Sequence, residues 1–139
     1  MRFKLTQNPI SSVPRQNVEK VDNRVLSEIE LATLLSDVQA ERFSQLTKFA
    51  ILLCLYSGGQ RPFEIINTRF EWIDLASRSW TMSEKITKDK KEHVIPMSTQ
   101  LITLVQDLRL FTSQSPFLIC SRLDPSKPMP TASLAQVLH

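Results

Sequence analysis

The spacing of apolar residues changes twice along the chain and divides it into helical and strand-forming parts. Up to about position 67 they recur every three or four residues, which is typical of helices that bury one face. From position 70 they alternate with polar residues over short runs, which indicates strands. After position 98 the helical spacing returns. We therefore expect an α+β fold that is mainly helical and contains a small three-stranded antiparallel sheet.

The N-terminal part divides into a polar segment and the start of a domain. Residues 1–24 are polar and contain two prolines, so we expect a linker or arm without a core of its own. A single domain is expected over residues 25–139. Its first helix runs to about Val38 and starts with a capping box, in which Ser27 and Glu30 each satisfy a free backbone N–H.

The only two glycines of the chain mark the junction of two predicted helices. The helix over about 43–57 is expected to end at Gly58 and Gly59, because glycine enters the left-handed conformation without a Cβ clash. Pro62 suits the first turn of the next helix, where its missing N–H is no loss. Arg61 would then lie beside free N–H groups, an arrangement that can bind phosphate. An ordinary turn with an exposed arginine is the alternative.

The strand-forming part contains three short runs, over residues 70–75, 79–82 and 93–97. Together they predict the antiparallel sheet, and the charged stretch between the second and third runs predicts a basic hairpin tip. Four lysines lie in that stretch: Lys85, Lys88, Lys90 and Lys91. Beyond the sheet we expect a helix capped by Ser98, a short buried segment over 117–120, and a helix starting near Thr131.

Composition and charge narrow the function only slightly. The chain has 139 residues, of which 42% are hydrophobic and 22% charged, so it can bury one real core. Seventeen basic against 14 acidic residues give a net charge of +3, which permits a nucleic-acid partner without requiring one. Cys54 and Cys120 are expected to be buried thiols in a reducing cytoplasm. We expect no metal, no small-molecule cofactor, no secretory signal and no membrane span.

Several short motifs together resemble the catalytic domain of the tyrosine recombinases, the phage integrase family. Residues 59–65, Gly-Gln-Arg-Pro-Phe-Glu-Ile, resemble the first arginine box of that family, and residues 69–74 resemble its continuation. Residues 87–97 resemble the hairpin that carries the family's lysine, and Leu26-Ser27-x-x-Glu30 resembles the usual opening of the domain. Each motif alone is weak evidence for the family, but their order and spacing together are fairly specific. The resemblance covers residues from about 24 to 138.

The resemblance implies DNA integration or recombination through a 3′-phosphotyrosyl intermediate, with arginines and no metal stabilising the reacting phosphate. It implies that Arg61 binds the phosphate, that Glu64 orients Arg61 or its surroundings, and that Lys88 is the general acid. Lys85, Lys90 and Lys91 are the alternatives for that acid and are expected to contact other DNA phosphates. The implied partners are double-stranded DNA and other recombinase subunits.

Three parts of the family pattern do not occur in this chain, namely the second box, His-x-x-Arg, a later His or Trp, and the nucleophilic tyrosine beyond it. Tyr56 precedes Arg61 and is expected to be structural, as are His93, Trp72 and Trp80. We therefore expect a piece of a bacterial or phage-encoded site-specific recombinase from a mobile element, inactive alone although its parent is an enzyme. The alternatives are a non-catalytic DNA-binding domain with a basic β-hairpin and a scaffold domain in which Arg61 is incidental.

Overall fold

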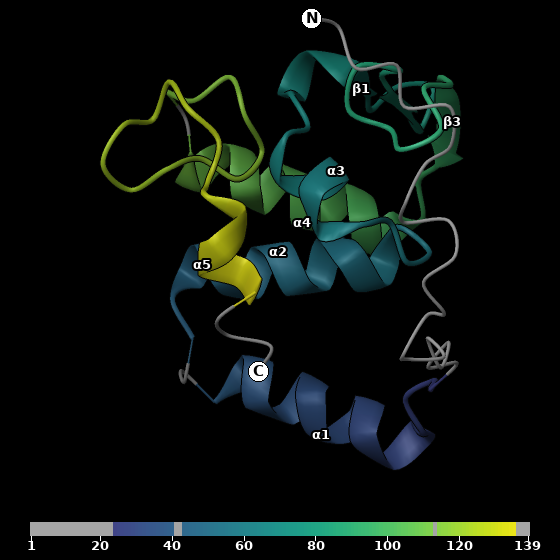
Figure 1. Ribbon diagram of the computed structural model, residues 1–139, viewed down its shortest axis with the longest axis vertical. Coiled ribbons are helices and arrows are strands. Elements are labelled where there is room, and N and C mark those ends of the chain that lie inside the picture. Colours follow the sequence, from purple (N-terminus) through teal and green to yellow (C-terminus); the bar gives the residue numbers. More distant parts are fainter. Residues whose placement is uncertain (1–23, 41–42, 113, 136–139) are drawn as a thin grey trace, which may run out of the picture.

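The computed structural model describes residues 24–40, 43–112 and 114–135, and it confirms the expected α+β fold (Figure 1). The described helices are α1 (Glu28–Gln39), α2 (Gln45–Tyr56), α3 (Pro62–Ile66), α4 (Thr99–Phe111) and α5 (Thr131–Ala135), with a 3₁₀ turn η1 (Phe70–Trp72). The strands are β1 (Ile73–Asp74), β2 (Ser79–Met82) and β3 (His93–Pro96). Apart from Arg24, the predicted N-terminal arm lies outside the described residues, so its boundary stays a prediction.

Helix α1 begins with the predicted capping box. The Ser27 backbone N–H donates to Glu30 Oε2 at 2.9 Å, and the Glu30 N–H donates to Ser27 Oγ at 3.3 Å. Glu30 also pairs with Arg24. The helix packs on α2, and Figure 1 shows it at the opposite end of the molecule from the sheet. Val38 is its only fully buried residue, so α1 joins the body mainly through its C-terminal part.

The core lies where α2, α3 and α4 meet one face of the sheet. The three strands pair in the order β1-β2-β3 and are antiparallel. In the central strand, Trp80 pairs with Ile73 on one side and Ile95 on the other, and the Trp80 side chain is completely buried. Trp72 is only half-buried. The two tryptophans therefore belong to the body of the fold, as expected.

The first predicted strand is shorter than the apolar pattern indicates. Residues 70–72 form η1, and only Ile73–Asp74 pair as β1. The Phe70 N–H donates to the Pro116 carbonyl at 3.0 Å, which ties this stretch to a distant loop instead of a sheet partner. The Arg109 guanidinium lies over the Phe70 ring at 4.5 Å from its centroid and fixes the same corner. Tertiary contacts therefore decide the local conformation here.

The C-terminal elements follow the predicted order. Of the predicted buried segment 117–120, residues 118–120 are buried and Phe117 is half-buried, and the Leu118 N–H donates to the Thr68 carbonyl at 3.0 Å. Helix α5 starts at Thr131, and its continuation beyond residue 135 lies outside the described residues.

The two cysteines differ in burial: Cys120 is buried and Cys54 is partly buried. Burial raises the pKa of the Cys54 thiol to about 11. None of the helices among the described residues is both long and apolar enough to cross a membrane.

Candidate phosphate-binding site

The turn between α2 and α3 is a Schellman motif built on the two glycines. The Gly58 N–H donates to the Leu55 carbonyl at 3.4 Å, and the Gly59 N–H donates to the Cys54 carbonyl at 3.0 Å. Gly58 has φ +82° and Gly59 has φ +84°, values that residues with a Cβ adopt only under strain. Helix α2 therefore ends abruptly at the glycines, as predicted from the sequence, and Arg61 follows after Gln60.

Arg61 is the N-cap residue of α3, and its side chain is exposed. Its backbone N–H donates to Glu64 Oε2 at 3.2 Å, while the Glu64 side chain is buried, with 6% of its surface exposed. The carboxylate thus fixes the backbone from which the guanidinium projects, and this contact is to the backbone rather than to the guanidinium. Helix α3 has only five residues, so the positive charge of the site comes from side chains more than from a helix dipole.

The lysine-bearing segment between β2 and β3 is a compact loop rather than an extended hairpin tip. The N–H groups of Ile86 and Thr87 both donate to the Ser83 carbonyl, at 3.1 and 3.3 Å. Ile86 packs against the core, and Thr87 is buried. The hydrophobic Ile86 and the hydrogen-bonded turn explain why the strands end at Met82 and resume only at His93.

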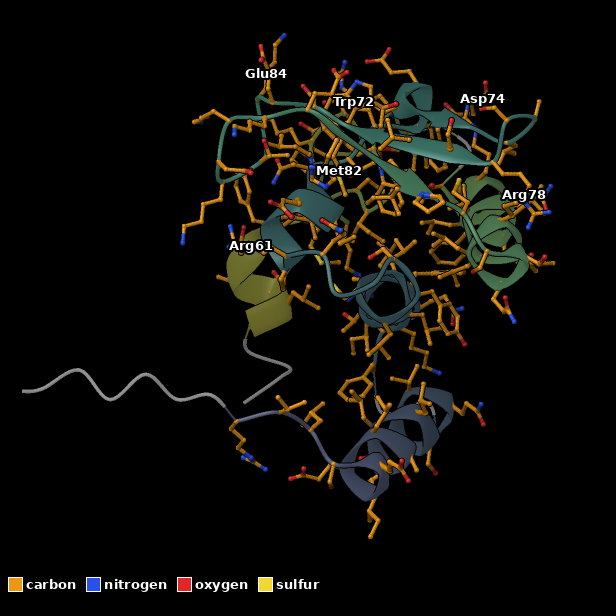
Figure 2. All side chains as sticks on the ribbon, turned by 90° about the vertical axis from the view of Figure 1, so that its right-hand side faces the viewer. Arg61, Trp72, Asp74, Arg78, Met82 and Glu84 are labelled. Carbon is orange, nitrogen blue, oxygen red and sulfur yellow. The ribbon has the colours of Figure 1, made fainter. Side chains whose placement is uncertain are left out.

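Arg61 and the loop lysines surround a common depression, here called the arginine–lysine hollow. It consists of two adjoining hollows of about 500 Å³ each, and Arg61, Glu64 and Lys88 line both. Figure 2 shows Arg61 beneath the end of the sheet at which Met82 and Glu84 lie, with Arg78 at the other end. The remaining lining residues are Gly59, Gln60, Phe63, Lys85, Ile86, Thr87, Asp89, Lys90 and His93.

The structure therefore brings together most of the residues that the sequence predicted as a site. Lys85 and Lys90 join Arg61 and Lys88 along the hollow, whereas Lys91 is exposed outside its lining. Four cationic side chains and two carboxylates line the hollow, so it carries an excess of positive charge suited to an anion. Among the described residues, no group of three or more His, Cys, Asp or Glu side chains is placed to hold a metal ion.

A contact between Gln60 and His93 was not predicted from the sequence. His93 Nε2 lies 3.3 Å from Gln60 Oε1, and the two residues come from the turn before α3 and from strand β3. The bond therefore fastens the Arg61 turn to the strand that follows the lysine loop. No local pattern marks this pair, because it exists only once α3 and the sheet have packed.

Tyr56 lies at the end of α2 and lines a different hollow. Its neighbours there come from α2 and α4 and include Leu52, Thr99 and Thr103, none of which lines the arginine–lysine hollow. The side chain is partly exposed. This position agrees with the expectation that Tyr56 does not act beside Arg61.

Comparison with known proteins places this chain in a family. The model of the phage integrase family matches residues 24–139. The prophage integrase IntZ of Escherichia coli (strain K12) is 30% identical over 79 residues, which are 57% of this chain and 19% of that protein. This chain therefore spans about a fifth of that curated relative.

Solved structures show the same fold. The integrase of transposon Tn1549, in complex with circular intermediate DNA, matches with a TM-score of 0.63 and 16% identity over 81% of this chain and 41% of that one. The XerA recombinase matches with a TM-score of 0.60 and 16% identity, over 81% and 40% of the two chains. Because the family model matches residues 24–139, the chain belongs to the phage integrase family.

Proposed function

We propose that this chain supplies the part of a site-specific recombinase's catalytic domain that holds the reacting DNA phosphate between Arg61 and Lys88. The observation that carries the proposal is that these two side chains, from α3 and from the β2–β3 loop, line the same hollow. Membership of the phage integrase family supports it, as does a relative of the same fold that was solved in complex with DNA.

The residues have distinct roles in this proposal. Negative charge builds up on the phosphoryl oxygens during strand transfer, and a preorganised guanidinium such as that of Arg61 stabilises it. Lys88 donates a proton to the departing 5′ oxygen as general acid. Glu64 holds the Arg61 backbone through its 3.2 Å hydrogen bond and keeps the guanidinium in place. Tyr56 lines another hollow and is not the nucleophile.

The neighbouring lysines and the wider assembly complete the proposal. Lys85 and Lys90 neutralise phosphates that flank the reacting one, and Lys91 contacts the backbone further out. The partner is double-stranded DNA in the cytoplasm of a bacterium, bound together with other recombinase subunits. The whole protein breaks and rejoins DNA, whereas this chain alone binds DNA without cleaving it.

DNA binding tests the phosphate role directly on this chain. We expect Arg61→Ala and Lys88→Ala each to weaken binding of a fluorescent duplex at low salt by about 10-fold, because each removes a charge-assisted contact. Each should also lower the slope of log affinity against log salt by about one. Arg122→Ala is the matched control, because Arg122 is exposed outside the hollow. Equal effects of Arg61→Ala and Arg122→Ala would contradict the proposal.

A non-catalytic DNA-binding domain is the second candidate, favoured by the exposed lysines of the loop. Cleavage by the whole protein separates the two. If Lys88 is the general acid, a substrate with sulfur in place of the bridging 5′ oxygen should restore cleavage by Lys88→Ala, because a thiolate leaves without protonation. Arg61→Ala should stay impaired on the same substrate. If the sulfur-containing substrate restores cleavage by Lys85→Ala or Lys90→Ala instead of by Lys88→Ala, the lysine replaced in that variant is the general acid.

A further inference from the structure

We infer that Thr87 is a positioning residue that fixes the lysine loop so that Lys88 reaches the arginine–lysine hollow; the inference rests on the function proposed above. Thr87 directly precedes Lys88, and only 2% of its surface is exposed. A buried hydroxyl needs a hydrogen-bond partner, and the partner of this one is the loop itself. The Thr87 Oγ1 donates to the Lys91 carbonyl at 2.9 Å.

Thr87 joins the two ends of the loop through every polar group that it has. Its N–H donates to the Ser83 carbonyl at 3.3 Å, at the point where the chain leaves β2. Its carbonyl accepts the Lys90 N–H at 3.3 Å, and its hydroxyl also lies 3.4 Å from the Glu84 carbonyl. The loop is thereby closed from residue 83 to residue 91 around one buried side chain.

The closed loop leaves the Lys88 side chain exposed but restricts the positions that its backbone can take. Lys88 is exposed and lines the hollow, while the residues before it, Ile86 and Thr87, are held by the core and by the loop bonds. Lys90 adopts φ +54°, a left-handed conformation that is kept only where surrounding contacts impose it. A lysine on such an anchored turn loses less freedom when it meets a phosphate, so its contact is stronger.

A double-mutant cycle on this chain tests the inference. We expect Thr87→Val, which keeps the shape and removes the hydroxyl, to weaken duplex binding by about 3- to 10-fold. In a Lys88→Ala background the same change should weaken binding clearly less, because the part of its effect that passes through Lys88 is already lost. Thr87→Ser should restore binding. Equal weakening in both backgrounds, or no rescue by serine, would overturn the inference.

A matched control separates positioning from general stability. The Thr112 side chain is also buried, and its hydroxyl donates to the Leu108 carbonyl at 2.9 Å, outside the hollow. Thr112→Val should therefore lower Tm without changing DNA affinity. If Lys88→Ala alone leaves affinity unchanged, the proposed function fails; if Lys88→Ala weakens binding but Thr87→Val does not, only the role of Thr87 fails.

Hydrogen exchange of the unaltered chain gives a second test, which does not depend on whether the variants fold. The amides of Thr87 and Lys90 donate within the loop, whereas those of Lys88 and Asp89 donate no backbone hydrogen bond among the described residues. We expect the first pair to exchange at least about tenfold more slowly than the second, as closed structure does. Equal exchange rates for all four amides would overturn the inference.

Discussion

Replacing Gly58 with alanine measures how much the stop between α2 and α3 contributes to stability. An alanine Cβ at Gly58 would meet no atom within 4 Å, so the cost is confined to the backbone at φ +82°. An L residue in the left-handed conformation costs about 1–2 kcal/mol. Alanine also restricts the unfolded chain, which returns about 0.4–1 kcal/mol. We therefore expect Gly58→Ala to lower the free energy of unfolding by about 0.8 kcal/mol, within limits of about 0 and 1.6 kcal/mol.

Urea unfolding followed by circular dichroism measures this change, with the slope against urea expected to stay constant. The corresponding fall in Tm is about 3 °C, and at most about 6 °C, for a domain of this size. Gly58→Asn is the control, because asparagine tolerates the left-handed conformation better, and its loss should be smaller. A Gly58→Ala variant more stable than the wild type by about 0.4–1 kcal/mol, the gain expected from the unfolded chain alone, would refute the assignment of a left-handed stop at this position.

Two further predictions concern the buried carboxyl and the partly buried thiol. Glu64→Ala deprives the Arg61 N–H of its acceptor and should lower the free energy of unfolding by about 1–2 kcal/mol. Glu64→Gln keeps an acceptor oxygen and should lower it less in the same urea experiment. Equal losses for the two variants would contradict this role of Glu64. Burial raises the pKa of Cys54 from 9.0 to about 11. Between these pH values the folded chain keeps the thiol proton and the unfolded chain loses it, so the stability of the wild type falls as pH rises. The difference in unfolding free energy between the wild type and Cys54→Ala should therefore be constant below about pH 9 and shrink as pH rises toward 11. Parallel stability curves for the two proteins across that range would contradict the buried thiol.

Features that depend on neighbouring residues were predictable from the sequence. The Ser27–Glu30 capping box and the stop at Gly58 arise from backbone groups a few positions away, and the structure shows both. The alternation around Phe70 was misleading, because the three-residue 3₁₀ turn is too short to show its own period, and it leaves Phe70 and Trp72 half-buried on either side of the exposed Glu71. The bond from the Phe70 N–H to the Pro116 carbonyl, which no local pattern contains, decides between the two conformations.

The site could be predicted only from the resemblance to the motifs of a known family, because the properties of neighbouring residues do not indicate it. Nothing in the residues between Arg61 and Lys88 requires the two side chains to meet, and the expectation came from the order of motifs in a known family. The same order carried no information about the Gln60–His93 contact or the closure of the loop by Thr87. These contacts depend on packing between elements, which single-sequence periodicity does not encode.

Helix α1 is attached to the rest of the described structure by little buried apolar surface. Among the described elements, α1 packs on α2, and it buries Val38 while Ile29 keeps 80% of its surface in solvent. A helix held by so little apolar area opens at a small fraction of the global unfolding energy. The hollow lies on α3 and the sheet, so detachment of α1 leaves its geometry intact. We therefore expect the arginine–lysine hollow to remain ordered while the helix that precedes it changes its orientation.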